Sequence, residues 1–344
     1  AQKDKIWADY LKLFDSILPN QVAKYTDVDY WESSPKYGRG NPKYQSEGDA
    51  HDWWVWHDAY PFEHFEDFVP RFMSEFGFQS FPSADVMKFI NQSEDIQIDT
   101  KAIRSHQKHH RGFELIDLYM GRDYLIPDND EDYIFLSQLV QARGMRIGIE
   151  AHRRAKPYNM GTLYWQLNDC WPGISWSSID HFGNWKALHY EAKDAFENVL
   201  ISFERHNDRV HVYIVNDLIT SLDESLEMKL IDFDGNVLWS ASKQIKVPSS
   251  SSNLVNSFSI DSGLTSKWNQ VLLQVNFGNS TSTYFFVKPK ELALKNNEIE
   301  FDFEKVNEGY LISMSSISLQ KGVMLSTTAK GHFSDNYFDL YPNE

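Results

Sequence analysis

Apolar residues along this chain follow two different periods, and the change falls near residue 200. Before it, short apolar runs alternate with helical patterns. Four runs predict short buried strands: YTDVDYW (residues 25–31), DWWVWH (52–57), RFMSEF (71–76) and TLYWQLN (162–168). A long helix is predicted over residues 130–155, where Phe135, Leu139, Ala142 and Met145 form one stripe, and another helix follows Asn184.

The chain opens directly in helical periodicity. One face is expected to hold Trp7, Tyr10, Leu11, Phe14, Ile17 and Leu18, with Pro19 ending the helix. A helix at the very start, with no strand before it, is typical of a chain entered midway.

Beyond residue 200 the period is two. The segments starting at Arg209, Leu226, Val271 and Ile299 alternate polar and apolar residues, with turns predicted at residues 234–236 and 278–279 and a surface loop over Ser249–Ser252. This pattern predicts antiparallel, immunoglobulin-like sandwiches.

Together the patterns predict an α/β part followed by all-β modules. Four strands alternating with helices are the right number for half of a (β/α)8 barrel. We therefore expect residues 1–200 to be the C-terminal half of a TIM barrel, residues 201–288 a β-sandwich, and residues 289–344 a second, incomplete sandwich.

Composition and charge limit the kinds of ligand or macromolecule that this chain can be expected to bind. A formal net charge of -16 argues against nucleic acid and anionic membrane surfaces, and no apolar run is long enough for membrane insertion. The negative charge does not argue against a neutral sugar as ligand. Aromatic residues make up 15% of the chain, and they can pack against sugar rings as well as fill a core. The single cysteine, Cys170, excludes an internal disulfide and is expected to be a buried structural thiol.

Each predicted strand of the first part ends in aromatic and polar residues. The carboxyl ends of parallel barrel strands meet at one face, so four such ends favour a pocket with aromatic walls. Glu75 lies among three phenylalanines and a methionine in RFMSEFGFQS. Its carboxylate is either a solvent-facing strand residue, paired with Arg71, or a group aimed into that pocket.

Two segments carry a resemblance to a known family. RFMSEFGFQSFPS and GTLYWQLNDCWPGISWSSIDHFGNWKALHY resemble the catalytic domain of β-mannosidases of glycoside hydrolase family 2. The resemblance implies that Glu75 is the catalytic nucleophile at the end of the seventh strand and that Trp165 is an aromatic platform at the end of the eighth. It implies a retaining exo-hydrolase that removes terminal β-D-mannose from β-mannosides, without a cofactor.

A retaining enzyme needs a second carboxyl about 5–5.5 Å from the nucleophile. The family supplies it from an Asn-Glu pair before the nucleophile, whereas here such pairs occur only downstream, at Asn297-Glu298, Asn307-Glu308 and Asn343-Glu344. The acid/base is therefore expected in another part of a parent polypeptide, and the chain alone is expected to be inactive. The parent's compartment stays open between secreted, periplasmic and lysosomal.

Further residues near the strand ends are candidate sugar ligands. Trp53, Trp54, Trp56 and His57 are predicted to alternate along one strand, so about half face the interior, and we assign substrate contacts to Trp54, Trp56 and His57. Asn168 and Asp169 follow Trp165 as hydrogen-bonding ligands or turn caps. Glu32 and Asp58 are structural residues or hydroxyl ligands.

The histidines of HQKHH (His106, His109, His110) suggest a metal site, but no ligand partners lie at suitable spacing. A solvated loop without a metal is the better interpretation.

Two other functions remain open. Another family 2 exo-glycosidase, such as a β-galactosidase, β-glucuronidase or exo-β-glucosaminidase, would differ in its contacts to the sugar's C2 and C6 groups. A non-catalytic carbohydrate-binding protein would need the aromatic platforms but not the carboxylate of Glu75.

Overall fold

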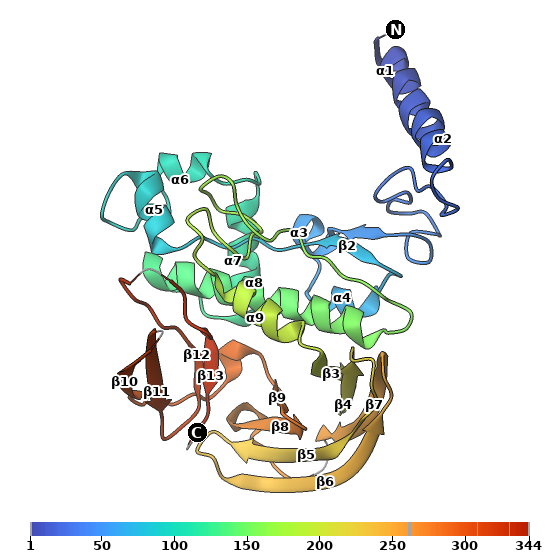
Figure 1. The fold of residues 1–344 in the computed structure, drawn as a ribbon. Coiled ribbons are helices and arrows are strands. Elements are labelled where there is room, and N and C mark those ends of the chain that lie inside the picture. The colour runs from blue at the N-terminus through green and yellow to red at the C-terminus, as the bar shows by residue number, and fades with distance from the viewer. Residues whose placement is uncertain (1, 261–262, 308, 330, 343–344) are drawn as a thin grey trace.

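The computed structural model describes residues 2–260, 263–307, 309–329 and 331–342, and Figure 1 shows a helix-rich part above an all-β part. The helix-rich part comprises α1 (Gln2–Leu11), the π-helix η1 (Lys12–Ile17), α2 (Leu18–Val22), β1 (Ala50–Asp52), α3 (Trp54–Asp58), α4 (His64–Asp67), β2 (Met73–Phe76), α5 (Ala84–Asn91), α6 (Lys101–Ser105), α7 (Gly112–Asp123), α8 (Asp130–Arg154) and α9 (Ala187–Ala195).

The all-β part forms several antiparallel sheets. Its elements are β3 (Val199–His206), β4 (Arg209–Asn216), β5 (Leu222–Asp232), β6 (Val237–Val247), β7 (Ser251–Ser259), η3 (Trp268–Gln270), β8 (Val271–Phe277), β9 (Ser280–Phe285), η4 (Pro289–Glu291), β10 (Glu300–Val306), β11 (Gly309–Ser315), β12 (Gln320–Val323) and β13 (Phe338–Leu340).

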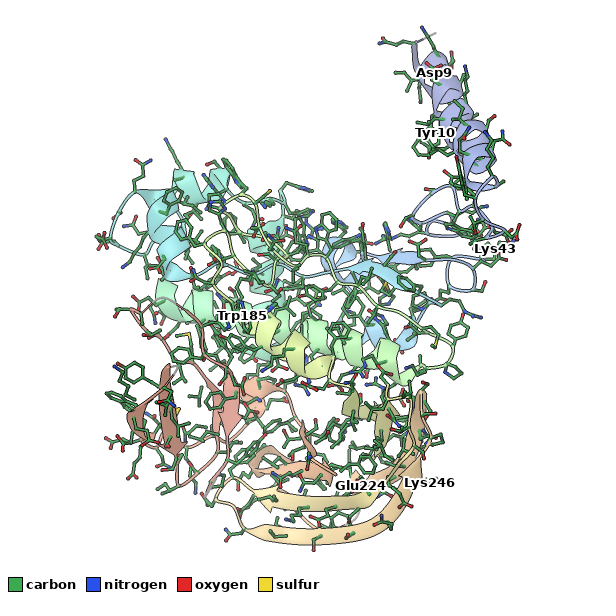
Figure 2. The ribbon with its side chains drawn as sticks, in the orientation of Figure 1. Asp9, Tyr10, Lys43, Trp185, Glu224 and Lys246 are labelled. Carbon is green, nitrogen blue, oxygen red and sulfur yellow. The ribbon has the colours of Figure 1, made fainter. Side chains whose placement is uncertain are left out.

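The first helical segment projects from the body of the molecule, and Asp9 and Tyr10 lie on it (Figure 2). None of its residues from Gln2 to Val22 is buried. The prediction that Pro19 ends the helix is wrong. Pro19 lies in the first turn of α2, where a missing N–H is tolerated, and the helix continues to Val22.

β1 and β2 pair in parallel, and the segment after Gly161 extends along the other side of β2. Met73 N donates to Gly161 O at 2.9 Å, Leu163 N to Met73 O at 2.8 Å and Trp165 N to Phe76 O at 2.8 Å. The predicted strand at residues 71–76 is confirmed, and the run at 162–168 is extended and contributes an isolated parallel bridge to Met73.

The other two strand predictions are wrong. Residues 25–31 contain no strand, and Tyr25 and Val28 are highly exposed. A strand needs a neighbour that supplies backbone partners, and this segment pairs with none of the described strands. In the run 52–57, the Asp52 carboxylate accepts from Trp54 N at 3.1 Å, which turns the chain out of β1 and into α3.

The predicted helix over 130–155 is confirmed as α8, the long helix across the centre of Figure 1. Asn129 caps it by accepting from Asp132 N at 2.9 Å, with acidic residues in its first turn and basic residues in its last. Ala142 and Met145 are buried in the core, and Phe135 and Leu139 pack at its margin. The helix after Asn184 is confirmed as α9.

The period-two segments form the predicted antiparallel strands. Sheets ordered β3-β4-β7 and β6-β5-β8-β9 enclose an apolar core, while β10-β11 and β12-β13 form separate two-stranded sheets. Gly235 and Gly278 adopt positive φ in the two predicted turns. Strands β3 and β7 were not expected, and β7 includes Ser251 and Ser252 from the run predicted as a loop.

Polar contacts join α8 to the sandwich. Glu150 accepts from Ser202 Oγ at 2.6 Å, Arg154 donates to the same hydroxyl at 2.7 Å, and Arg153 pairs with Asp217 at 3.0 Å. Of the expected α/β part followed by antiparallel β modules, the β modules are confirmed, whereas the half-barrel is supported only in part, by the parallel pairing of β1 with β2 and the extended segment beside β2. Over the described residues, no helix is long and apolar enough to cross a membrane.

Candidate active site

Glu75 lies on β2 directly beside His51 of β1, because the parallel register pairs these two residues. Its carboxylate is half-buried. Trp53 Nε1 donates to Glu75 Oε2 at 3.2 Å, and His51 Nδ1 lies 3.3 Å from the same oxygen. Arg71, the alternative partner, instead lies over the ring of Tyr158 at 5.4 Å. The carboxylate is thus held by an indole and an imidazole at the end of a parallel strand.

A polar cluster lies behind His51. Asp49 Oδ2 accepts from Ser34 Oγ at 2.6 Å and from Ser74 Oγ at 2.5 Å. Ser34 Oγ also lies 3.3 Å from His51 Nε2. His51 is therefore bracketed by two acidic side chains, Asp49 on one side and Glu75 on the other.

Trp165 lies at the end of the extended segment beside β2. Its side chain is 43% exposed, and its peptide bond to Gln166 is cis. Gly77 makes the close approach possible: a Cβ at this position would lie 2.3 Å from Trp165 O and 3.2 Å from atoms of both Trp53 and Trp176. The end of β2, Trp53 and the Trp165 backbone therefore converge at Gly77.

His57 is joined to this group through Trp53. The two rings lie 5.5 Å apart, and His57 Nδ1 lies 3.3 Å from His109 Nε2. Burial and nearby Arg39 lower the pKa of His57. Burial, together with the neighbouring His57, His110 and Arg111, lowers the pKa of His109 to about 4. Burial disfavours the charged imidazole, so both rings favour the neutral form.

The interpretation of HQKHH as a simple solvated loop is corrected by these contacts. His106 stacks on Trp171 with ring centroids 4.9 Å apart, and its Nδ1 lies 2.6 Å from Pro172 O. His109 packs against Trp56. Within the described residues, no three histidine, cysteine or carboxylate side chains are grouped so that they could hold a metal ion.

Burial contradicts the predicted sugar contact of Trp56, whereas Trp54 is half-buried and its contact stays a prediction. Trp56 is fully buried and packs against Phe78 in the core, so its ring cannot meet a ligand here. Trp54 packs against Tyr44 and His64, with the Arg39 guanidinium over its ring at 4.6 Å. Both follow from the helix at α3, because the prediction of contacts rested on strand alternation.

The buried carboxylate of Asp169 is already occupied by donors from the protein. It accepts from Ser177 Oγ at 2.6 Å, from Lys108 Nζ at 2.6 Å and also from Ser175 Oγ. Asn168 is exposed, and its backbone carbonyl accepts from Gln166 Nε2 at 3.0 Å.

Cys170 is exposed, which corrects the expectation of a buried thiol. The remaining acidic candidates form surface ion pairs. Glu32 pairs with Lys36 at 2.9 Å, and Asp58 pairs with Arg39. Of the downstream Asn-Glu pairs, Glu308 and both residues of Asn343-Glu344 lie outside the described residues.

Sequence reasoning missed His51 as a neighbour of Glu75 and assigned no substrate contact to Trp53. The sequence does weakly indicate Trp53 as a site residue, because it is one of the aromatic residues in the run 52–57, which was predicted to end at the active face. Nothing local indicates His51, since its position depends on the pairing of β1 with β2.

Two family models match the all-β part. Residues 208–291 match the Mannosidase Ig/CBM-like domain, and residues 294–344 match an Ig-fold domain. These matches support the predicted immunoglobulin-like character of the β modules.

The similar proteins include β-mannosidases. β-Mannosidase A of Emericella nidulans is 25% identical over 319 residues, which are 80% of this chain and 34% of that protein. The crystal structure of a β-D-mannosidase from Dictyoglomus thermophilum has a TM-score of 0.89 and 30% identity, covering 97% of this chain and 42% of that one. An exo-chitosanase of Amycolatopsis orientalis, with a TM-score of 0.60 and 17% identity over 79% of this chain and 39% of its own, shares the fold. This chain therefore spans about a third of the curated relative and less than half of either solved chain.

Proposed function

We propose that this chain is part of a longer retaining exo-glycosidase. It corresponds to the C-terminal region of the β-mannosidases of glycoside hydrolase family 2. The enzyme would remove terminal non-reducing β-D-mannose residues from β-mannosides. The observation that carries the proposal is the half-buried carboxylate of Glu75 at the end of β2, held by Trp53 beside the backbone of the exposed Trp165.

In this proposal Glu75 is the nucleophile. One carboxylate oxygen forms an ester bond to the anomeric carbon while the bond from that carbon to the leaving oxygen breaks, and a general acid protonates the leaving oxygen. Water then attacks the same carbon, a general base takes its proton, and Glu75 is released as the carboxylate with free mannose. Two displacements at one carbon retain its configuration.

The remaining groups have supporting roles. Trp165 presents an exposed indole on which the hydrophobic face of a sugar ring can pack. His57 would bind a sugar hydroxyl through its ring, and Asn168 is exposed and available to do the same. The acid/base would come from a part of the parent outside this chain.

The architecture follows the same proposal. Residues 1–200 would be the second half of a (β/α)8 barrel, with β1, β2 and the segment after Gly161 as three neighbouring parallel strands. Residues 201–288 and 289–344 would be the two sandwich modules.

The test compares this chain with its full-length parent on aryl β-mannoside, β-galactoside and β-glucuronide. We expect the parent to prefer the mannoside and the isolated chain to be inactive, because general acid catalysis contributes about 10²–10⁴-fold and substrate orientation is also lost. In the parent, Glu75→Gln should lower turnover by about 10⁴-fold or more. The matched control Glu32→Gln removes a half-buried carboxylate that pairs with Lys36, and it should leave turnover unchanged.

A 2-fluoro-mannoside that traps the intermediate should label Glu75 in the parent. Labelling at another residue, or rapid turnover by the isolated chain, would contradict the assignment. Preference for galactoside or glucuronide would overturn the substrate. Sugar binding without hydrolysis of any glycoside would favour a carbohydrate-binding protein instead.

A further inference from the structure

His51 lies between two acidic side chains, and its contacts determine where its protons are. Asp49 Oδ2 accepts from the hydroxyls of Ser34 and Ser74. A serine hydroxyl has one proton, so Ser34, having donated to an ionised Asp49, can only accept from His51 Nε2, which lies 3.3 Å away. Nε2 of His51 therefore carries a proton.

The other ring nitrogen of His51 must also carry one. Nδ1 lies 3.3 Å from Oε2 of Glu75. A bare Nδ1 would direct its lone pair at a carboxylate oxygen, which is repulsive, whereas an N–H at this distance is attractive. Both ring nitrogens of His51 thus face an acceptor, Ser34 Oγ at Nε2 and Glu75 Oε2 at Nδ1.

The two contacts of Glu75 fall on a single oxygen. Trp53 Nε1 donates to Oε2 at 3.2 Å, and the contact with His51 is made by the same atom. Among the described residues, none donates to Oε1 of Glu75. One carboxylate oxygen is thus fixed by the protein, and the other is left for a ligand.

We propose that His51 is a positioning residue for Glu75. As an imidazolium oriented by Asp49, it acts with Trp53 to fix Oε2, so that Oε1 is the oxygen that attacks the anomeric carbon. This inference rests on the proposed role of Glu75 as nucleophile. The adjacent positive charge also stabilises the carboxylate that must leave when the glycosyl ester is hydrolysed.

The groups around His51 are compatible with this arrangement. On the ring side lie Asp49, Glu75 and the serine hydroxyls, and the backbone carbonyl of His51 accepts from the hydroxyl of Tyr44. The neighbouring carboxylate of β1, Asp52, belongs to a different pair, because its Oδ2 lies 3.2 Å from Nε2 of His64. That second His–Asp pair serves as a matched control.

The protonation state can be measured on this chain without any enzymatic assay. In ¹⁵N-histidine-labelled protein at neutral pH, we expect the His51 signals to show protons on both ring nitrogens, with assignment by their loss in His51→Gln. Asp49→Asn and Glu75→Gln should each shift His51 toward a single neutral tautomer, whereas His64→Gln should leave its signals unchanged. A neutral His51 in the unsubstituted chain would overturn the inference.

Kinetics of the full-length parent test the positioning role. His51→Gln should lower kcat by about 10²-fold, as for loss of one preorganised donor, with KM for aryl β-mannoside nearly unchanged because the role proposed for the ring is to hold Glu75 and not to bind the sugar. Asp49→Asn, which is isosteric, should give a smaller loss of the same kind, and His64→Gln should not change kcat.

The two proposals fail in different ways. If Glu75→Gln retains turnover, the nucleophile assignment is wrong. If Glu75 is labelled by the fluoro-sugar but His51→Gln and Asp49→Asn keep full kcat, the nucleophile assignment stands and the positioning role of His51 is refuted.

Discussion

Replacing Gly77 with alanine should destabilise the helix-rich part of the chain by about 1–3 kcal/mol. Gly77 follows β2 and is buried, and an added Cβ would lie 2.3 Å from the backbone oxygen of Trp165. Ordinary contact begins near 3.4 Å, so β2 and the segment at Trp165 must separate by about 1 Å. The contact is with backbone, so a simple side-chain rotation cannot relieve it.

The magnitude follows from the hydrogen bonds across the same boundary. Trp165 N donates to Phe76 O, and Leu163 N to Met73 O, both at 2.8 Å. A separation of about 1 Å takes both beyond hydrogen-bond range, at a net cost of about 1 kcal/mol each. The reduced backbone entropy of the unfolded alanine chain offsets about 0.4–1 kcal/mol.

Urea unfolding followed by tryptophan fluorescence is a suitable assay. Of the 11 tryptophans, only Trp239 and Trp268 lie beyond residue 200, so the fluorescence reports mainly on the helix-rich part. The matched control is Gly121→Ala in α7, whose added Cβ would meet only Ile126 Cδ1, at 3.7 Å. It should be neutral or stabilising by up to about 1 kcal/mol. If the Gly77→Ala chain were as stable as the unsubstituted one, the predicted steric clash between the added Cβ and the Trp165 backbone would be refuted.

Two further predictions concern pH. Burial lowers the pKa of His152 to about 3, whereas an unfolded histidine titrates near about 6.5, so the unfolded state binds more protons between these values. The free energy of unfolding should therefore fall as pH is lowered from about 6.5 to 3, and urea unfolding curves should show a weaker fall in His152→Gln. Burial also lowers the pKa of Lys186 to about 7, against about 10.4 when unfolded. The free energy of unfolding should rise between about pH 7 and 10, and the same assay on Lys186→Met should show that this rise is lost.

Long periodic elements could be predicted from the sequence because their burial is encoded locally. The stripe of α8 and the alternation in β4, β5 and β8 each repeat over several residues, and their cores are enclosed by similarly patterned neighbours. β7 was missed because its serines and asparagines resemble a loop, although it pairs with β4 along its length.

The partners of Glu75 could not be predicted in the same way. The register that places His51 beside Glu75 joins residues from separate elements, with α3 and α4 between them. Glu75 itself was proposed from its unusual aromatic surroundings and from a resemblance, whereas the cluster of Ser34, Asp49 and Ser74 depends entirely on tertiary contacts.

The segment after β1 shows why the assignment of the aromatic contacts depends on secondary structure. A strand would place Trp54 and Trp56 on one face and Trp53 and His57 on the other, and substrate contacts were expected at Trp54, Trp56 and His57. In the helix, His57 N instead donates to Trp53 O at 2.8 Å, and the rings of these two residues lie together on one side. Trp56 is directed into the core. The turn at Asp52 therefore places the ring of Trp53 at Glu75 and the ring of His57 next to Trp53, an arrangement that strand alternation could not predict.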